Sequence, residues 1–193
     1  DIYDNIPPSL KKLKIYAFDT TLINGYNKSK IYTISKNNNT YTINETPTIN
    51  GNFALGIFTY DKSNNAYNKN GVYSIKLSID DNVHYEFKAD ELDFSTTRYI
   101  NAHMDYHEKK ESKNKYHRCY KLPNNKLTNY TKLVDNATPL PTEGRMNISG
   151  LQVYEYYSEL YITLQILKIK PFEKDNAKTF KNFNYFSSFF WNR

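Results

Sequence analysis

The stretch Gly71-Val-Tyr-Ser-Ile-Lys-Leu-Ser-Ile-Asp80 alternates apolar and polar side chains, which is the pattern of a half-buried β-strand. Successive side chains of a strand point to opposite faces, so one face would carry four apolar side chains. These are Tyr73, Ile75, Leu77 and Ile79. Asp81-Asn82 then supplies a two-residue turn into a second strand, Val83–Phe87. The sequence therefore predicts a β-hairpin with one buried face.

Short segments of the same kind precede and follow this hairpin. They lie around Ile31 and Ile34, around Tyr41 and Ile43, at Phe53–Ile57, and in a second hairpin of Ile148–Tyr156 and Leu160–Lys170. One stretch, Ser95–Ser112, suits a helix but has too few apolar positions for a long core helix. We therefore expect a mostly β chain, an immunoglobulin-like antiparallel β-sandwich with one short helical insertion.

The chain divides into three parts by composition. Residues 1–12 include Pro7-Pro8 and read as a stiff linker from an upstream domain. Residues 13–170 form the β-sandwich module, with an insertion at about residues 90–135, and residues 171–193 form an aromatic tail. The first four residues have neither the basic head nor the apolar stretch of a signal peptide. If the protein is exported, we expect the chain to be the processed form or an internal fragment.

The cysteine count and the hydropathy pattern narrow the class of protein. Cys119 is the single cysteine of the 193 residues, so no intrachain disulfide forms and the fold rests on packing. The sequence around Cys119 shows no Ser/His/Asp or Cys/His arrangement that would make it a nucleophile. No apolar run approaches the ~18 residues that a membrane-spanning helix requires.

The positive charge of the chain is concentrated in one segment. Residues 109–126 carry a net charge of +6, which equals the formal net charge of the whole chain. Lys109, Lys110, Lys113 and Lys115 are the candidates for contact with an anionic polymer or an anionic lipid surface, and a solvated loop is the alternative. We do not expect a nucleic-acid partner, because no zinc-finger, helix-turn-helix or RNA-binding signature accompanies the charge.

The segment Asn101-Ala-His-Met-Asp-Tyr-His-Glu-Lys-Lys110 contains two candidate metal ligands, His103 and His107. On a helix His103 and His107 would face the same side, which suits zinc. A catalytic site also needs a third ligand and a base, and Glu108 follows the second histidine instead of the first. His117 lies in the basic segment, whose charge opposes a dication. We expect no metal here and interpret this segment as a polar helix or loop that braces the sheet.

The last part of the chain is rich in aromatic side chains. The candidates for partner binding are Phe183, Phe186, Phe189, Phe190 and Trp191. Phe183, Phe186 and Phe190 follow helical spacing, which favours a short amphipathic helix. This tail either folds back onto the core or contacts a partner protein or a membrane surface.

Four motifs in a fixed order resemble the region that follows the catalytic domain in lysostaphin-type (LytM-type) zinc peptidases of Bacteroidota. They are Asp4–Pro8, Asn68–Leu77, Thr97–Tyr106 and Pro123–Leu127. The resemblance covers residues 1 to 170. The chain departs from that family at its last turn, where Tyr156–Leu160 lacks the glycine of the family's Asp-x-x-Gly-Asn turn.

The resemblance implies an extracytoplasmic protein of the periplasm or outer membrane. The family binds zinc through His-x-x-x-Asp and His-x-His motifs, and neither occurs in this sequence. We therefore expect a non-catalytic accessory module that positions or docks a peptidase-like domain, with no cofactor in this chain and zinc only in an upstream domain. The alternatives are part of an active peptidoglycan endopeptidase and a structural subunit of an outer-membrane complex. The expected partners are envelope or outer-membrane proteins, with peptidoglycan as a further candidate.

Overall fold

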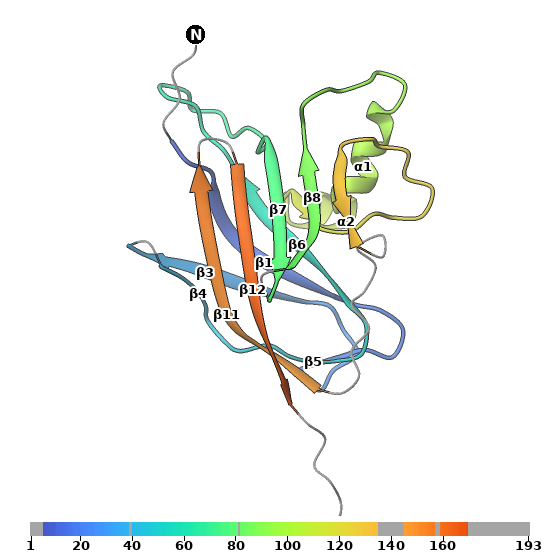
Figure 1. The fold of residues 1–193 in the computed structure, drawn as a ribbon. Coiled ribbons are helices and arrows are strands. Elements are labelled where there is room, and N and C mark those ends of the chain that lie inside the picture. The colour runs from blue at the N-terminus through green and yellow to red at the C-terminus, as the bar shows by residue number, and fades with distance from the viewer. Residues whose placement is uncertain (1–5, 39, 81, 135–144, 157–158, 170–193) are drawn as a thin grey trace, which may run out of the picture.

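The computed structural model describes residues 6–38, 40–80, 82–134, 145–156 and 159–169. In this part of the chain the structure is mostly β, with two sheets and a few short helices (Figure 1). The first sheet contains, in spatial order, β4 (Thr40–Ile43), β3 (Lys30–Asn37), β1 (Ser9–Ala17), β6 (Phe53–Tyr60) and β9 (Tyr116–Arg118). The second contains β10 (Tyr130–Leu133), β8 (Asn82–Lys88), β7 (Ser74–Ile79), β12 (Glu159–Ile169), β11 (Arg145–Tyr156), β5 (Thr48–Asn50) and β2 (Leu22–Ile23).

The predicted hairpin at the centre of the sequence is present as β7 and β8. Ile75, Leu77 and Ile79 are buried, as the alternation predicts. Tyr73 lies before β7 and is 37% exposed, so its placement on the buried face was wrong. Ile79 pairs with Asn82, which moves the turn one residue earlier than the sequence suggests.

One hydrophobic cluster draws on both sheets. Leu13, Ile15 and Ile57 come from the first sheet. Ile75 and Leu160 come from the second, and all five side chains are almost fully buried. Burial of apolar area between the sheets is the main stabilising contribution to a fold that has no disulfide.

The expectation of a purely antiparallel arrangement was wrong at one pair of strands. β12 runs parallel to β7, in a register from Glu159 opposite Ser74 to Leu164 opposite Ile79. The second hairpin, β11 with β12, is antiparallel as predicted. Parallel neighbours require a long connection, and the chain between Ile79 and Glu159 supplies one because it includes the insertion.

The insertion contributes strands to both sheets and three short helical segments. These are η1 (Thr97–Tyr99), α1 (Ile100–His103) and α2 (Tyr106–Glu111), and they lie to one side of the sheets near β8 (Figure 1). The single helix predicted for Ser95–Ser112 was wrong, because the chain is extended at Met104 and Asp105. There the Asp105 amide donates to the Tyr116 carbonyl at 2.8 Å, and Met104 forms a bridge with His117. Pairing with β9 thus interrupts the helix.

The ends of the described chain bear on two further expectations. β1 begins at Ser9, ahead of residue 13, where the sequence places the start of the module. The aromatic tail of residues 171–193 lies outside the described residues. Within the described part, no helix has the length and apolar character needed to cross a membrane.

Removing a side chain from the shared hydrophobic cluster should leave a cavity and lower the free energy of unfolding. Leu160 is completely buried, so Leu160→Ala should lower the free energy of unfolding by about 2 to 5 kcal/mol. Leu92 is 59% exposed, so Leu92→Ala should change it by less than about 0.5 kcal/mol. Urea denaturation measures both, and equal effects would contradict the placement of Leu160 between the sheets.

Candidate functional site

Asp105 is the most heavily bonded side chain of the insertion. Its side chain is the N-cap of α2 and accepts from the Glu108 amide at 3.3 Å. The carboxylate also accepts from Lys14 Nζ and from the Tyr16 hydroxyl, each at 2.8 Å, and from Arg118 Nη2 at 3.3 Å. Asp105 is only 2% exposed. One buried carboxylate therefore joins α2, β1 and β9.

The charges around Asp105 compensate one another. Lys14 Nζ also pairs with Glu108 Oε1 at 2.8 Å, so two cations face two carboxylates. Arg118 Nη1 donates to the carbonyls of Ala102 and Met104, which the end of α1 leaves without helical partners. Arg118 Nε is buried without a hydrogen-bond partner, but both carboxylates and both cations of the group are paired. Because a buried charge is tolerated only when it is paired, this group acts as a structural anchor.

The ionisation of Asp105 follows from these contacts. Burial acts to raise the pKa of Asp105, but the hydrogen bonds from Lys14 and Tyr16 and the charge of Lys14 outweigh it, so the pKa lies below its ordinary value. Burial and the bond to Asp105 raise the pKa of the Tyr16 hydroxyl, which stays protonated and donates. Asp105 is therefore an ionised acceptor at neutral pH, as the anchor requires.

Two imidazoles meet beside this anchor. His103 Nε2 lies 2.9 Å from His117 Nδ1, and the Phe87 ring stacks on His103 at a centroid distance of 4.2 Å. His103 is completely buried and His117 is 7% exposed. The structure does not bring His103 and His107 together, because the break after α1 leaves His107 exposed on α2. The sequence missed His117, since only the pairing of β9 with β6 places it opposite His103.

Both buried imidazoles are neutral. Burial, with smaller contributions from His117 and Arg118, holds the pKa of His103 well below its ordinary value. Burial together with the Lys115 charge lowers the pKa of His117 to about 4. Within the described ranges, no three His, Cys, Asp or Glu side chains are grouped so that they could hold a metal ion. Burial also raises the pKa of the Cys119 thiol to about 12, so it is no nucleophile at neutral pH.

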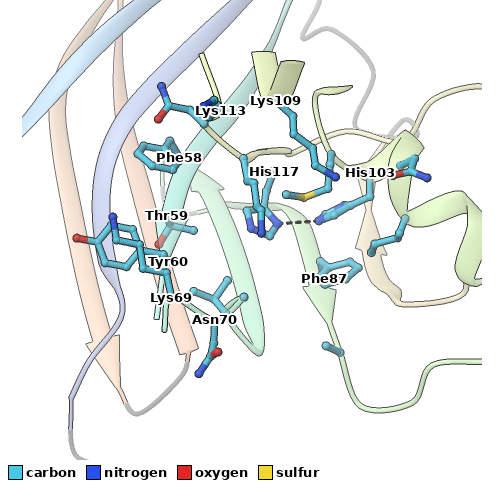
Figure 2. Close-up of a pocket in the computed structure, with 18 of the residues that line it drawn as sticks. Phe58, Thr59, Tyr60, Lys69, Asn70, Phe87, His103, Lys109, Lys113 and His117 are labelled. Carbon is cyan, nitrogen blue, oxygen red and sulfur yellow. Dashed lines mark hydrogen bonds between the residues drawn. The ribbon is translucent and has the colours of Figure 1, made fainter. Parts of the chain in front are cut away.

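A pocket of about 540 Å³ lies between the insertion and the strand ends, with the imidazole pair in its lining (Figure 2). Lys109, Lys113 and Lys115 of the predicted basic cluster line it, and Lys69 joins them from the loop before β7. Lys110 does not line the pocket and lies over the Tyr106 ring, at 5.3 Å from its centroid. Three of the four predicted lysines therefore surround one cavity, and Lys69 was not expected there.

The predicted partner-binding aromatics, Phe183, Phe186, Phe189, Phe190 and Trp191, lie outside the described residues. Among the described residues, the pocket beside the imidazole pair is the candidate site, because it gathers three of the predicted lysines and both buried histidines. Comparison with protein family models, with curated proteins and with solved structures gave no match.

Removing the charge of Asp105 should release the anchor. Asp105→Asn leaves Lys14 and Arg118 with one carboxylate fewer, so the free energy of unfolding should fall by about 3 to 5 kcal/mol. The matched control is Glu111→Gln on the exposed side of α2, expected to change it by less than about 0.5 kcal/mol. Urea denaturation compares the two, and an Asp105→Asn effect no larger than that of the control would contradict the anchor.

The neutral imidazoles make stability depend on pH. In the unfolded chain their pKa is about 6.5, so below that pH the unfolded state binds more protons and stability falls as the pH falls. For His117 the loss extends down to about pH 4 and amounts to about 3 kcal/mol. His117→Gln should flatten this slope, and His107→Gln should not, because His107 is exposed. Denaturation at a series of pH values between about 7 and 4.5 measures the slopes; equal slopes for native protein and His117→Gln would contradict the assignment.

Proposed function

We propose that this chain is a non-catalytic accessory module of a cell-envelope LytM-type zinc peptidase or peptidase-like protein, which it positions or docks in the envelope. The observation that carries the proposal is that the side chains capable of catalysis are bonded to other side chains of the fold. Asp105 is held by Lys14 and Arg118, and His103 and His117 are buried, neutral and hydrogen-bonded together. Such residues hold an insertion in place and do not activate water.

Three of the four stretches on which the family resemblance rests come together in space. Asn70 of the second motif lines the pocket, and so does His103 of the third. Asn125 of the fourth motif donates to the Tyr130 hydroxyl, which in turn contacts His103. Motifs that are far apart in the sequence thus build one region, which supports reading them as parts of a single module.

The finer fold proposal is an immunoglobulin-like sandwich of the two sheets. The hydrophobic cluster shared by the sheets supports it, because sheets packed face to face bury their apolar faces against each other. The parallel pair of β7 with β12 is a departure from the purely antiparallel form. In this proposal the module binds no cofactor, zinc belongs to an upstream domain, and the module works in the periplasm or at the outer membrane with envelope proteins as partners.

The isolated chain should not hydrolyse peptidoglycan. Purified sacculi incubated with the chain and excess zinc should release no soluble fragments above the buffer blank, while a lysostaphin-type enzyme assayed in parallel should release them. The expected result follows because His103, His117 and Asp105 are buried and hydrogen-bonded within the fold. Fragment release that a chelator abolishes would contradict a non-catalytic role.

A second check concerns the coding sequence upstream of Asp1. The proposal expects a lysostaphin-type domain there, with the His-x-x-x-Asp and His-x-His ligands in an active parent and with replaced ligands in a scaffold. An upstream region unrelated to such peptidases would contradict the proposed role.

A further inference from the structure

A chain of hydrogen bonds leads from the loop before β10 to the pocket. The Leu127 amide donates to Asn125 Oδ1 at 3.0 Å, which fixes the orientation of the Asn125 amide. Asn125 Nδ2 then donates to the Tyr130 hydroxyl at 3.0 Å. The Tyr130 hydroxyl lies 3.3 Å from His103 Nδ1, and His103 Nε2 lies 2.9 Å from His117 Nδ1.

The direction of this chain sets the tautomer of both imidazoles. An amide nitrogen only donates, so Tyr130 accepts from Asn125. We assign the Tyr130 proton to His103 Nδ1, because no other acceptor among the described residues contacts this hydroxyl. His103 then carries its proton on Nε2 and donates it to His117 Nδ1. With this assignment, a neutral His117 carries its proton on Nε2. Among the described residues this Nε2 has no hydrogen-bond partner, and His117 lines the pocket.

The lysines of the pocket add positive charge without compensation. Lys69, Lys109, Lys113 and Lys115 line it, and none of them forms an ion pair with a described residue. No Asp or Glu of the described chain is in the lining. Figure 2 shows Lys109 and Lys113 along one edge and Lys69 toward the other. A concave site lined by cations concentrates anions. The His117 N–H adds a hydrogen-bond donor that points in a fixed direction.

The rest of the lining combines apolar side chains with the neutral polar residues Thr59, Tyr60, Asn70, Asn101 and Asn114. The apolar part is the one that a ligand body can cover. It includes Phe58, Val72, Phe87, Leu92, Ile100 and Met104. The volume of about 540 Å³ falls within the range of roughly 300 to 1,000 Å³ that small-molecule sites occupy. A simple inorganic anion would leave these apolar side chains uncovered.

We propose that this pocket binds a small amphipathic anion, with one carboxylate or phosphate group joined to an apolar body. The acidic group accepts from the lysine ammonium groups and from His117 Nε2, and the apolar body lies against Phe58 and Phe87. The neutral state of His117 keeps this donor present without adding a titrating charge near pH 7. The proposal stands independently of the accessory role.

Calorimetric titration of the native chain with simple probes tests the ligand class. Octanoate and octyl phosphate, kept below their micellar concentrations, should bind at least about tenfold more tightly than inorganic phosphate, octanol or octylammonium. Preference for either acidic probe supports the site and identifies its head group. Equal affinity for octanol and octanoate would overturn it, because the charged groups would then contribute nothing.

Neighbouring lysines provide a matched pair of variants. The double variant Lys109→Gln, Lys113→Gln should weaken octanoate binding by about tenfold, since it removes two cations from the lining. Lys110→Gln should leave the affinity unchanged, because Lys110 lies over Tyr106. If Lys110→Gln costs as much as the double variant, or if soluble peptidoglycan fragments bind more tightly than octanoate, the lysines form a diffuse polymer-binding surface and the proposal fails.

The tautomer gives a readout that does not depend on affinity. In ¹⁵N spectra of the imidazoles, His117 should be protonated on Nε2 in the folded protein, and octanoate should shift that resonance. Tyr130→Phe removes the donor to His103 Nδ1, so it should mix the tautomers and weaken octanoate binding while the chain stays folded. A His117 protonated on Nδ1 in the native chain would overturn the proposed donor.

Discussion

The Asp105 carboxylate is the contact on which the arrangement of the insertion depends. It caps α2, accepts from Lys14 and Tyr16 of β1, and pairs with Arg118 of β9. In a buried place each of these groups alone would carry a desolvation cost, and together they offset it. Ion pairs and hydrogen bonds of Asp105 therefore fix the insertion against the first sheet. The apolar cluster shared by the two sheets supplies the bulk of the stability.

This anchor explains why two nearby histidines are buried in contact with each other. By holding the break between α1 and α2 against β9, it buries His103 against Phe87 and points its ring at His117. The same placement leaves a cationic and apolar pocket beside the pair. A recessed pocket with cationic and apolar side chains is suited to binding, and binding is the common element of the two proposals.

The hairpins could be predicted from the local alternation of apolar residues. The contacts between segments far apart in the sequence could not. The hairpins of β7 with β8 and of β11 with β12 follow from alternating apolar residues. The parallel contact of β7 with β12 joins segments far apart, and no local pattern specifies it. Spacing placed His103 with His107 on one helix, but the pairing of Asp105 with Tyr116 breaks that helix. The lysine cluster could be predicted from the charge of the segment. The sequence did not predict that three of these lysines line a cavity together with Lys69.

Native-state hydrogen exchange of two amides tests the anchor most directly. The Asp105 amide donates to the Tyr116 carbonyl and the Lys109 amide to the Asp105 carbonyl, so both report on the attachment of the insertion. If the anchor fixes the insertion to the sheet, both amides should exchange with the same free energy of opening as the β1 amide of Ile15. Exchange at a markedly lower free energy than Ile15 would show that the insertion opens by itself, and would contradict the account.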